Sequence, residues 1–136
     1  MLPEDGLAAT SLRADVPHRE ILNKEILATE MILDIGPKAI DSYQQALKEV
    51  RTVLWNGPMG AFEVRPFDTA TVNLAQMVAK ATEKGYLLSV AGGGDTVAAL
   101  NHAGVAEEFS YVSLAGGAFL EYIEGKTLPG VEVLST

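Results

Sequence analysis

The chain has 136 residues, of which 48% are hydrophobic, and its formal net charge is −8. This size and composition predict one domain with a modest core and exclude a disordered chain. An acidic chain with 10 Lys and Arg residues is unsuited to bind duplex nucleic acid, and the absence of Cys excludes disulfides and thiolate metal sites. No apolar run predicts a membrane span, no signal-peptide pattern opens the sequence, and a reducing cytosol is compatible with the composition.

The first third of the chain gives weaker signals than the rest. Residues 7–13 are predicted as a strand, and residues 15–27 as a loop with a short turn or strand. The first clear helix starts at Asp34-Ile35-Gly36-Pro37, because proline is favoured at the first helical position. We interpret Asp34 as a cap of this helix start. The apolar residues that follow at helical spacing are Ala39, Tyr43, Ala46, Leu47 and Val50.

After residue 50 the sequence repeats one pattern three times: an apolar run, a glycine-rich turn and a helix. The apolar runs are residues 52–55, 86–90 and 111–113, and the turns are residues 56–60, 92–94 and 115–117. The predicted helices open at Asp68 (as N-cap), Asp95 and Ala118, and they end near Gly85, Gly104 and Gly125. Residues 127–136 are predicted as a tail.

Repeated strand–turn–helix units predict an α/β fold, a three-layer αβα arrangement with helices on the faces of a parallel sheet. In open sheets of this kind, ligands bind beyond the carboxyl ends of the strands. All three glycine-rich turns follow the carboxyl end of a predicted strand, so we expect them to meet at one edge of the sheet. Their convergence favours a site for a phosphorylated small molecule.

The segment AGGGDT, residues 91–96, is the strongest single signal. A buried strand that breaks at glycines and restarts as a helix leaves free N–H donors at the positive end of the helix dipole, which suits a phosphate. Asp95 adds a carboxylate that suits a metal ion accompanying that phosphate. The alternative is a tight turn with Asp95 as an N-cap, and the residues of this segment alone leave both interpretations open.

Several common motifs are excluded. The glycines are not followed by the lysine and hydroxyl of a P-loop, and Val97 stands where a dinucleotide fingerprint needs its third glycine. No serine occupies a nucleophile elbow. His18 and His102 are isolated in the sequence, which favours surface or structural roles over catalytic ones. Trp55 and Phe62 are interpreted as packing residues.

Four ordered segments nevertheless resemble the phosphoglycerate kinase family. They are MILDIGP (31–37), WNGPMGAFE (55–63), AGGGDT (91–96) and SLAGGAFLEYIEGKTLPGVE (113–132), and ADVP (14–17) also matches. The resemblance covers nearly the whole chain. It implies that residues 1–136 are the latter part of the nucleotide-binding C-terminal domain of such an enzyme. The activity it implies is reversible phosphoryl transfer between 1,3-bisphosphoglycerate and ADP, giving 3-phosphoglycerate and ATP in glycolysis, in the cytoplasm.

The resemblance assigns roles on the phosphate side of the implied site. Asp95 matches the aspartate that holds the Mg²⁺ of Mg-ADP or Mg-ATP. Gly93, Gly94 and Thr96 match the turn and helix start that receive the nucleotide phosphates. Gly116 and Gly117 match a second glycine turn whose backbone donors face the transferred phosphoryl group, so that the glycines of both turns are implied catalytic positions.

The resemblance also assigns the nucleoside side. Glu63 matches the acid that binds the ribose hydroxyls, which suits a side chain with two acceptor oxygens. Asn56 matches an asparagine near the triphosphate. The apolar residues that match the walls around the adenosine are Leu33, Met31, Pro58 and Met59.

The sequence departs from the family pattern at two positions before the last glycine turn. Leu114 stands where a threonine is usual, and Ala115 stands at a position often held by glycine. Losing the threonine hydroxyl removes one possible phosphate contact.

The resemblance further implies what the chain lacks. The 3-phosphoglycerate site belongs to an N-terminal domain, and the phosphate-binding lysines belong to the earlier half of the nucleotide domain. We therefore expect the chain alone to be catalytically silent. The alternative hypothesis is a non-catalytic α/β module that self-associates through exposed sheet edges.

Overall fold

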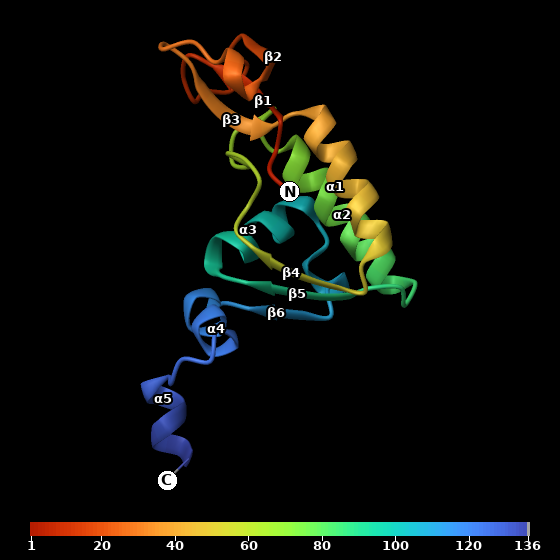
Figure 1. The fold of residues 1–136 in the computed structure, drawn as a ribbon, viewed down its shortest axis with the longest axis vertical. Coiled ribbons are helices and arrows are strands. Elements are labelled where there is room, and N and C mark those ends of the chain that lie inside the picture. Colours follow the sequence, from red (N-terminus) through yellow and green to blue (C-terminus); the bar gives the residue numbers. More distant parts are fainter. Residues whose placement is uncertain (136) are drawn as a thin grey trace.

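Two three-stranded sheets organise the chain in the computed structural model, which describes residues 1–135 (Figure 1). The first sheet is antiparallel with strand order β2-β1-β3 and contains β1 (Asp5–Ala9), β2 (His18–Leu22) and β3 (Met31–Ile35). The second sheet is parallel with order β4-β5-β6 and contains β4 (Thr52–Asn56), β5 (Leu88–Gly92) and β6 (Tyr111–Ser113).

The antiparallel sheet differs most from the sequence-based expectation. The strand predicted at residues 7–13 starts earlier, at Asp5, and ends at Ala9. The region predicted as a loop with a short turn or strand contains both, the strand β2 and the short 3-10 helix η1 (Asn23–Glu25). Only Ile21 of β2 is buried, so this strand carries no alternating apolar pattern that a sequence could show.

Helix α1 (Pro37–Glu49) connects the two sheets, and α2 (Thr69–Glu83) connects β4 to β5 within the parallel sheet. Both helices are confirmed close to their expected bounds. The capping prediction for α1 is wrong, because Asp5 and not Asp34 caps it: the N–H groups of Lys38 and Ala39 donate to the Asp5 carboxylate at 2.9 and 2.8 Å. Asp34 instead accepts from the N–H of Ala70 in α2 at 3.0 Å.

The remaining elements follow the predicted alternation. They are α3 (Gly94–Ala103), the 3-10 helix η2 (Ala106–Glu108), α4 (Gly116–Ile123), α5 (Pro129–Glu132) and the 3-10 helix η3 (Val133–Ser135). The strand expected at 86–90 lies two residues later, and the helix expected from Ala118 starts at Gly116. The predicted tail contains α5 and η3, because Pro129 suits a first helical turn; Thr136 lies outside the described residues.

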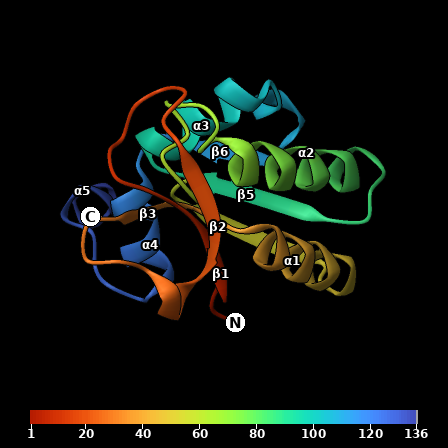
Figure 2. The ribbon, with the colours of Figure 1, turned by 90° about the horizontal axis from the view of Figure 1, so that it is seen from above.

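The α/β class, with a parallel sheet flanked by helices, is confirmed. Figure 2 shows α1 and α2 alongside each other over the parallel sheet, and α3 packs beside α2. The main core lies between these helices and the sheet and includes Trp55, Leu74, Leu100 and Phe109. α4 and α5 extend from the carboxyl end of the sheet, away from α1 and α2 (Figure 1). Across residues 1–135, every helix is too short or too polar to cross a bilayer.

Candidate functional site

The carboxyl ends of the three parallel strands are in register. Asn56, the last residue of β4, lies beside Gly92 of β5, and Gly92 lies beside Ser113 of β6. Each strand is followed at once by one of the glycine-rich turns. The three turns therefore start from one edge of the sheet, as the order of elements predicted.

Two of these turns touch each other directly. The N–H of Gly93 donates to the carbonyl oxygen of Ser113 at 2.9 Å, which ties the turn after β5 to the end of β6. A Cβ atom on Gly116 would collide with the backbone of Gly93, so only glycine allows this close approach. Gly93 also has φ 104°, which a side chain would disfavour. The contact brings the amino ends of α3 and α4 together.

The amino end of α3 carries uncapped donors. Gly93 is the N-cap residue, and no side chain caps the helix. The N–H groups of Gly94, Asp95 and Thr96 are therefore the groups that the helix itself cannot pair. Gly94 and Asp95 are exposed, with Asp95 in the first turn of the helix rather than at the N-cap position. The N–H of Gly93 is used by Ser113, which removes it from the donors available to a ligand.

Thr96 joins the first turn to the second. Its side chain is 1% exposed, and its Oγ1 accepts a hydrogen bond from the N–H of Gly57 at 2.6 Å. The Asn56 side chain lies nearby, since a Cβ on Gly93 would sit 3.4 Å from Asn56 Oδ1. The hydroxyl of Thr96 thus holds the loops together, while its backbone N–H lies in the first turn of α3.

The turn after β6 presents a different surface. Ala115 is the N-cap residue of α4, and its N–H donates to Ser113 Oγ at 3.2 Å. Gly116 is buried against Gly93, whereas Gly117 is exposed. Leu114 is 76% exposed, so the residue that replaces the usual threonine turns an apolar side chain to solvent.

A separate hollow of about 350 Å³ lies between β3 and the loop after β4. Leu33, Pro58 and Met59 line it together, which brings three of the predicted nucleoside-side residues to one place. Met31 is not among its lining residues and is 44% exposed. Glu63 is exposed on the loop before α2 and also does not line this hollow.

Asp34 lies at the base of this hollow, and sequence reasoning gave it only a capping role. Its carboxylate is 2% exposed and accepts hydrogen bonds from the N–H groups of Ile35 and Ala70. Burial raises the pKa of Asp34 to about 6, although these hydrogen bonds act in the opposite direction. Gly60 packs directly on the carboxylate, and a Cβ there would collide with it. Ala70, the donor from α2, lies 36 residues away in the sequence, so no local sequence signal could have revealed this contact.

The side chains of Asp68 and His102 are hydrogen-bonded to each other, which the sequence did not reveal. His102 Nε2 lies 2.8 Å from Asp68 Oδ2, and Arg65 Nε lies 3.6 Å from the same oxygen. Asp68 stands at the N-cap position of α2, as predicted, but its side chain makes no cap hydrogen bond. His102 therefore has a structural partner and is not isolated in space.

The groups at the amino end of α3 suit a hard cation that is bound together with phosphates. Within residues 1–135 no group of three or more His, Cys, Asp and Glu side chains could hold a metal by itself. Asp95 is a single exposed carboxylate beside uncapped N–H donors. Mg²⁺ commonly binds through one or two carboxylates together with substrate phosphates and water, so one protein carboxylate at this place is sufficient.

Comparison with known proteins gives a consistent result. The family model described as "Phosphoglycerate kinase" matches residues 1–126. The chain is 59% identical over 133 residues to the phosphoglycerate kinase of Zymomonas mobilis and 58% identical over 134 residues to that of Xanthobacter flavus. Each match covers 98% of this chain and 34% of the relative, so the chain spans about a third of the length of the curated relatives it matches.

Solved structures agree with the sequence comparison. Phosphoglycerate kinase from Coxiella burnetii matches with a TM-score of 0.87 and 40% identity, covering 98% of this chain and 34% of that one. Phosphoglycerate kinase from Pyrococcus horikoshii matches with a TM-score of 0.78 and 28% identity, covering 98% and 32% respectively. Because the family model alone spans nearly the whole sequence, this chain belongs to the phosphoglycerate kinase family.

Proposed function

We propose that this chain supplies the Mg-nucleotide part of a phosphoglycerate kinase site. The reaction is the reversible transfer of a phosphoryl group between 1,3-bisphosphoglycerate and ADP, a step of glycolysis in the cytoplasm. The observation that carries the proposal is the direct contact between Gly93 and Gly116, which joins the amino ends of α3 and α4 where the parallel strands end. Family membership supports the same reaction.

The phosphate side of the proposed site uses backbone donors. The N–H groups of Gly94, Asp95 and Thr96 bind the nucleotide phosphates at the positive end of α3. The N–H groups of Gly116 and Gly117 in the first turn of α4 face the phosphoryl group that moves. Phosphoryl transfer needs alignment and charge neutralisation more than covalent work by the protein, so fixed donors of this kind suit it.

Asp95 holds Mg²⁺ in this proposal. The bound ion would neutralise charge on the nucleotide phosphates and on the moving group. Asp95 suits the task because it is exposed and lies in the first turn of α3, beside the uncapped N–H donors. Asn56 contributes a polar side chain beside the same turn.

The nucleoside side uses the hollow beside β3. We assign Leu33, Pro58 and Met59 to the walls around the adenosine, because these side chains share one hollow. Glu63 is assigned to the ribose hydroxyls from the family pattern. Its exposed position on the loop leaves its carboxylate available for hydrogen bonds to a ligand.

The chain alone is proposed to be catalytically silent. It corresponds to part of a nucleotide-binding domain, and about two thirds of the length of its relatives has no counterpart in it. We place the 3-phosphoglycerate site and the phosphate-binding lysines in those other parts. ATP-dependent turnover of 3-phosphoglycerate by the 136-residue chain, in a coupled assay, would contradict this statement.

A second candidate function is self-association without catalysis. The face of the parallel sheet opposite α1 and α2 exposes Leu54, Leu88 and Tyr111 at 44%, 47% and 68%. Adjacent exposed apolar side chains on one sheet face favour association between copies. Sedimentation of the chain over a range of concentrations measures this directly.

Calorimetric titration with Mg-ADP tests the main proposal. We expect measurable binding by the unaltered chain, loss of binding in Asp95→Ala and unchanged binding in the control Asp41→Ala, an exposed carboxylate on α1. Equal binding by the unaltered chain and Asp95→Ala would refute the role of Asp95. Absence of binding together with a concentration-dependent dimer would favour the second candidate.

A further inference from the structure

The loop between β4 and α2, residues 57–68, is tied to α3 at both of its ends. At its start, the N–H of Gly57 donates to Thr96 Oγ1 at 2.6 Å. At its end, Asp68 Oδ2 lies 2.8 Å from His102 Nε2. Thr96 lies in the first turn of α3 and His102 in the last, which places these two ties about 9 Å apart along the helix axis. One helix therefore carries the phosphate donors and also holds the loop that carries residues assigned to the nucleoside.

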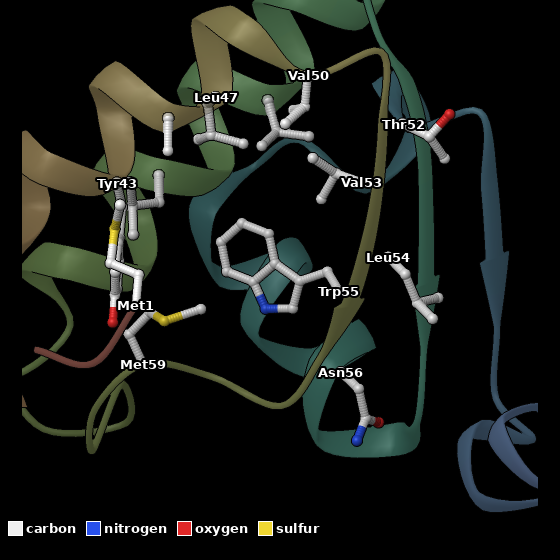
Figure 3. Close-up of a pocket in the computed structure, with 13 residues that line it drawn as sticks. Met1, Tyr43, Leu47, Val50, Thr52, Val53, Leu54, Trp55, Asn56 and Met59 are labelled. Atoms are coloured by element: carbon white, nitrogen blue, oxygen red, sulfur yellow. The ribbon is translucent and has the colours of Figure 1, made fainter.

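The start of this loop is fixed without any contribution from His102. Trp55 Nε1 donates to the carbonyl of Gly57 at 2.6 Å, and the N–H of Met59 donates to Thr71 Oγ1 at 3.0 Å. Figure 3 shows the Trp55 side chain reaching from β4 toward α1, and Met59 lying near Tyr43 of that helix. Met59 also packs against the main core. This half of the loop belongs to the packed interior.

The half of the loop around Glu63 depends on Phe62. Glu63 itself is exposed, and Val64 packs on the other side of the chain, against the apolar cluster around Phe67. The Phe62 ring is 7% exposed and meets the ring of His102 edge to face, with centroids 6.0 Å apart and an angle of 66° between the planes. This is a separation and orientation that aromatic rings favour. The ring of His102 thus supports the residue immediately before Glu63.

The Asp68 carboxylate fixes the orientation of the His102 ring. A carboxylate only accepts hydrogen bonds, so His102 Nε2 donates. Asp68 is at the N-cap position of α2, yet its side chain makes no cap hydrogen bond there. An aspartate at an N-cap ordinarily stabilises its own helix, and here that carboxylate is directed to α3 instead. Arg65 Nε, 3.6 Å from the same oxygen on a side chain that is 83% exposed, adds little.

We propose that His102 is a positioning residue for the nucleotide, which holds Glu63 at a set distance from the phosphate donors of α3. This role rests on the proposed function, in which Glu63 binds the ribose hydroxyls. His102 is in the last turn of α3, away from the donors of the first turn, so it acts through Phe62 and the loop. A nucleoside diphosphate uses both the loop and the helix start, whereas inorganic pyrophosphate uses the helix start alone. His102 therefore contributes to binding of the first ligand and not of the second.

Calorimetric titration with Mg-ADP and with Mg-pyrophosphate tests this selectivity. His102→Ala should weaken Mg-ADP binding about fivefold and change Mg-pyrophosphate binding by less than about twofold. His102→Gln, whose amide N–H replaces the Nε2 donor, should bring Mg-ADP binding back to within about twofold of the unaltered chain. The matched control is Asn101→Ala, an exposed neighbour on α3, which should change neither affinity.

A double-mutant cycle with Glu63→Ala identifies the residue through which His102 acts. If His102 serves to place Glu63, its replacement has little further effect once Glu63 is gone. In the Glu63→Ala background, His102→Ala should therefore weaken Mg-ADP binding by less than about twofold. A merely structural role of His102 would give the same loss in both backgrounds.

Amide hydrogen exchange without nucleotide tests the effect on the loop itself. The N–H groups of Phe62 and Val64 donate to carbonyl groups within the loop at 2.8 and 3.0 Å. His102→Ala should speed exchange at these two amides about fivefold. The N–H of Ala61 donates to Leu33 of β3 at 2.8 Å and serves as the internal reference, because its rate should stay unchanged.

Three results would overturn the proposal. They are equal losses of Mg-ADP and Mg-pyrophosphate binding in His102→Ala, additive losses in the cycle with Glu63→Ala, and unchanged exchange at Phe62 and Val64. Failure of the unaltered chain to bind Mg-ADP would instead contradict the proposed function. In that case the exchange rates at Phe62 and Val64 still decide whether His102 positions the loop.

Discussion

The buried carboxylate of Asp34 accepts a hydrogen bond at 3.0 Å from the backbone N–H of Ala70, and so joins the end of β3 to the first turn of α2. These residues are 36 positions apart in the sequence. The bond fixes the wall of the hollow assigned to the nucleoside relative to the helix that supports the parallel sheet. Burial of the same carboxylate couples the stability of this region to pH.

The raised pKa of Asp34 predicts that protonation stabilises the folded chain. Burial raises the pKa from 3.8 in the reference state to about 6, so the folded state binds a proton that the unfolded state has released. The contribution of Asp34 to stability is therefore greatest below about pH 4 and declines as the pH rises to about 6, by at most about 3 kcal/mol.

Urea unfolding of the unaltered chain and Asp34→Asn between pH 4 and 7 measures this effect. The unaltered chain should gain stability relative to Asp34→Asn as the pH falls through this range. The comparison with Asn removes contributions from other carboxylates, including Glu30, whose pKa is lowered by its hydrogen bond to Arg19. A constant difference between the two proteins at every pH would contradict the prediction.

Asp5→Ala is expected to destabilise the chain by about 1 to 2 kcal/mol. The change leaves the N–H groups of Lys38 and Ala39 without their acceptor at the start of α1. Asp41→Ala, on the exposed surface of the same helix, should change the free energy of unfolding by less than about 0.5 kcal/mol. Equal effects of the two substitutions in urea unfolding would show that Asp5 is not the cap.

Gly116→Ala and Gly117→Ala form a matched pair. A methyl group on Gly116 collides with the backbone of Gly93, whereas one on Gly117 meets no atom within 4 Å. Gly116→Ala should therefore cost about 1 to 3 kcal/mol through overpacking, and Gly117→Ala should stay within about 0.5 kcal/mol. Thermal unfolding compares them, and similar melting temperatures for both variants would mean that the two turns do not touch.

Thr96→Val tests the link between the first two turns. The substitution keeps the shape of the side chain but removes the acceptor for the N–H of Gly57, so it should cost about 1 to 2 kcal/mol. Thr96→Ser retains the oxygen and should recover at least half of that loss. If Ser and Val at this position are equally unstable in urea unfolding, the hydrogen bond is not the reason that threonine matters.

The second half of the fold could be predicted from sequence because its signals are local. Apolar runs alternate with glycine-rich turns and helices, and the C-cap glycine Gly104, at φ 73°, ends α3 as the pattern indicates. The antiparallel sheet could not be predicted in this way. Its strand β2 buries a single side chain, so tertiary pairing rather than periodicity determines it.

The residues of the candidate site were likewise only partly predictable from local sequence signals. Asp95 and its glycines were visible from the residues alone, whereas Glu63, Leu33 and Met59 were assigned only through the family resemblance. The contacts of Asp5 and Asp34 span 33 to 36 residues and depend on how the sheets pack. The structural role of the Thr96 hydroxyl was also missed, because its partner lies 39 residues away.

The central claim is that Mg-ADP binds where the turns after the parallel strands meet. Backbone ¹H–¹⁵N NMR spectra recorded during a titration with Mg-ADP test it most directly. We predict the largest shifts at the amides of Gly94, Asp95 and Gly117, with smaller shifts at Leu33 and Met59. Shifts confined to residues outside these turns and the hollow beside β3, or no shifts at saturating nucleotide, would contradict the claim.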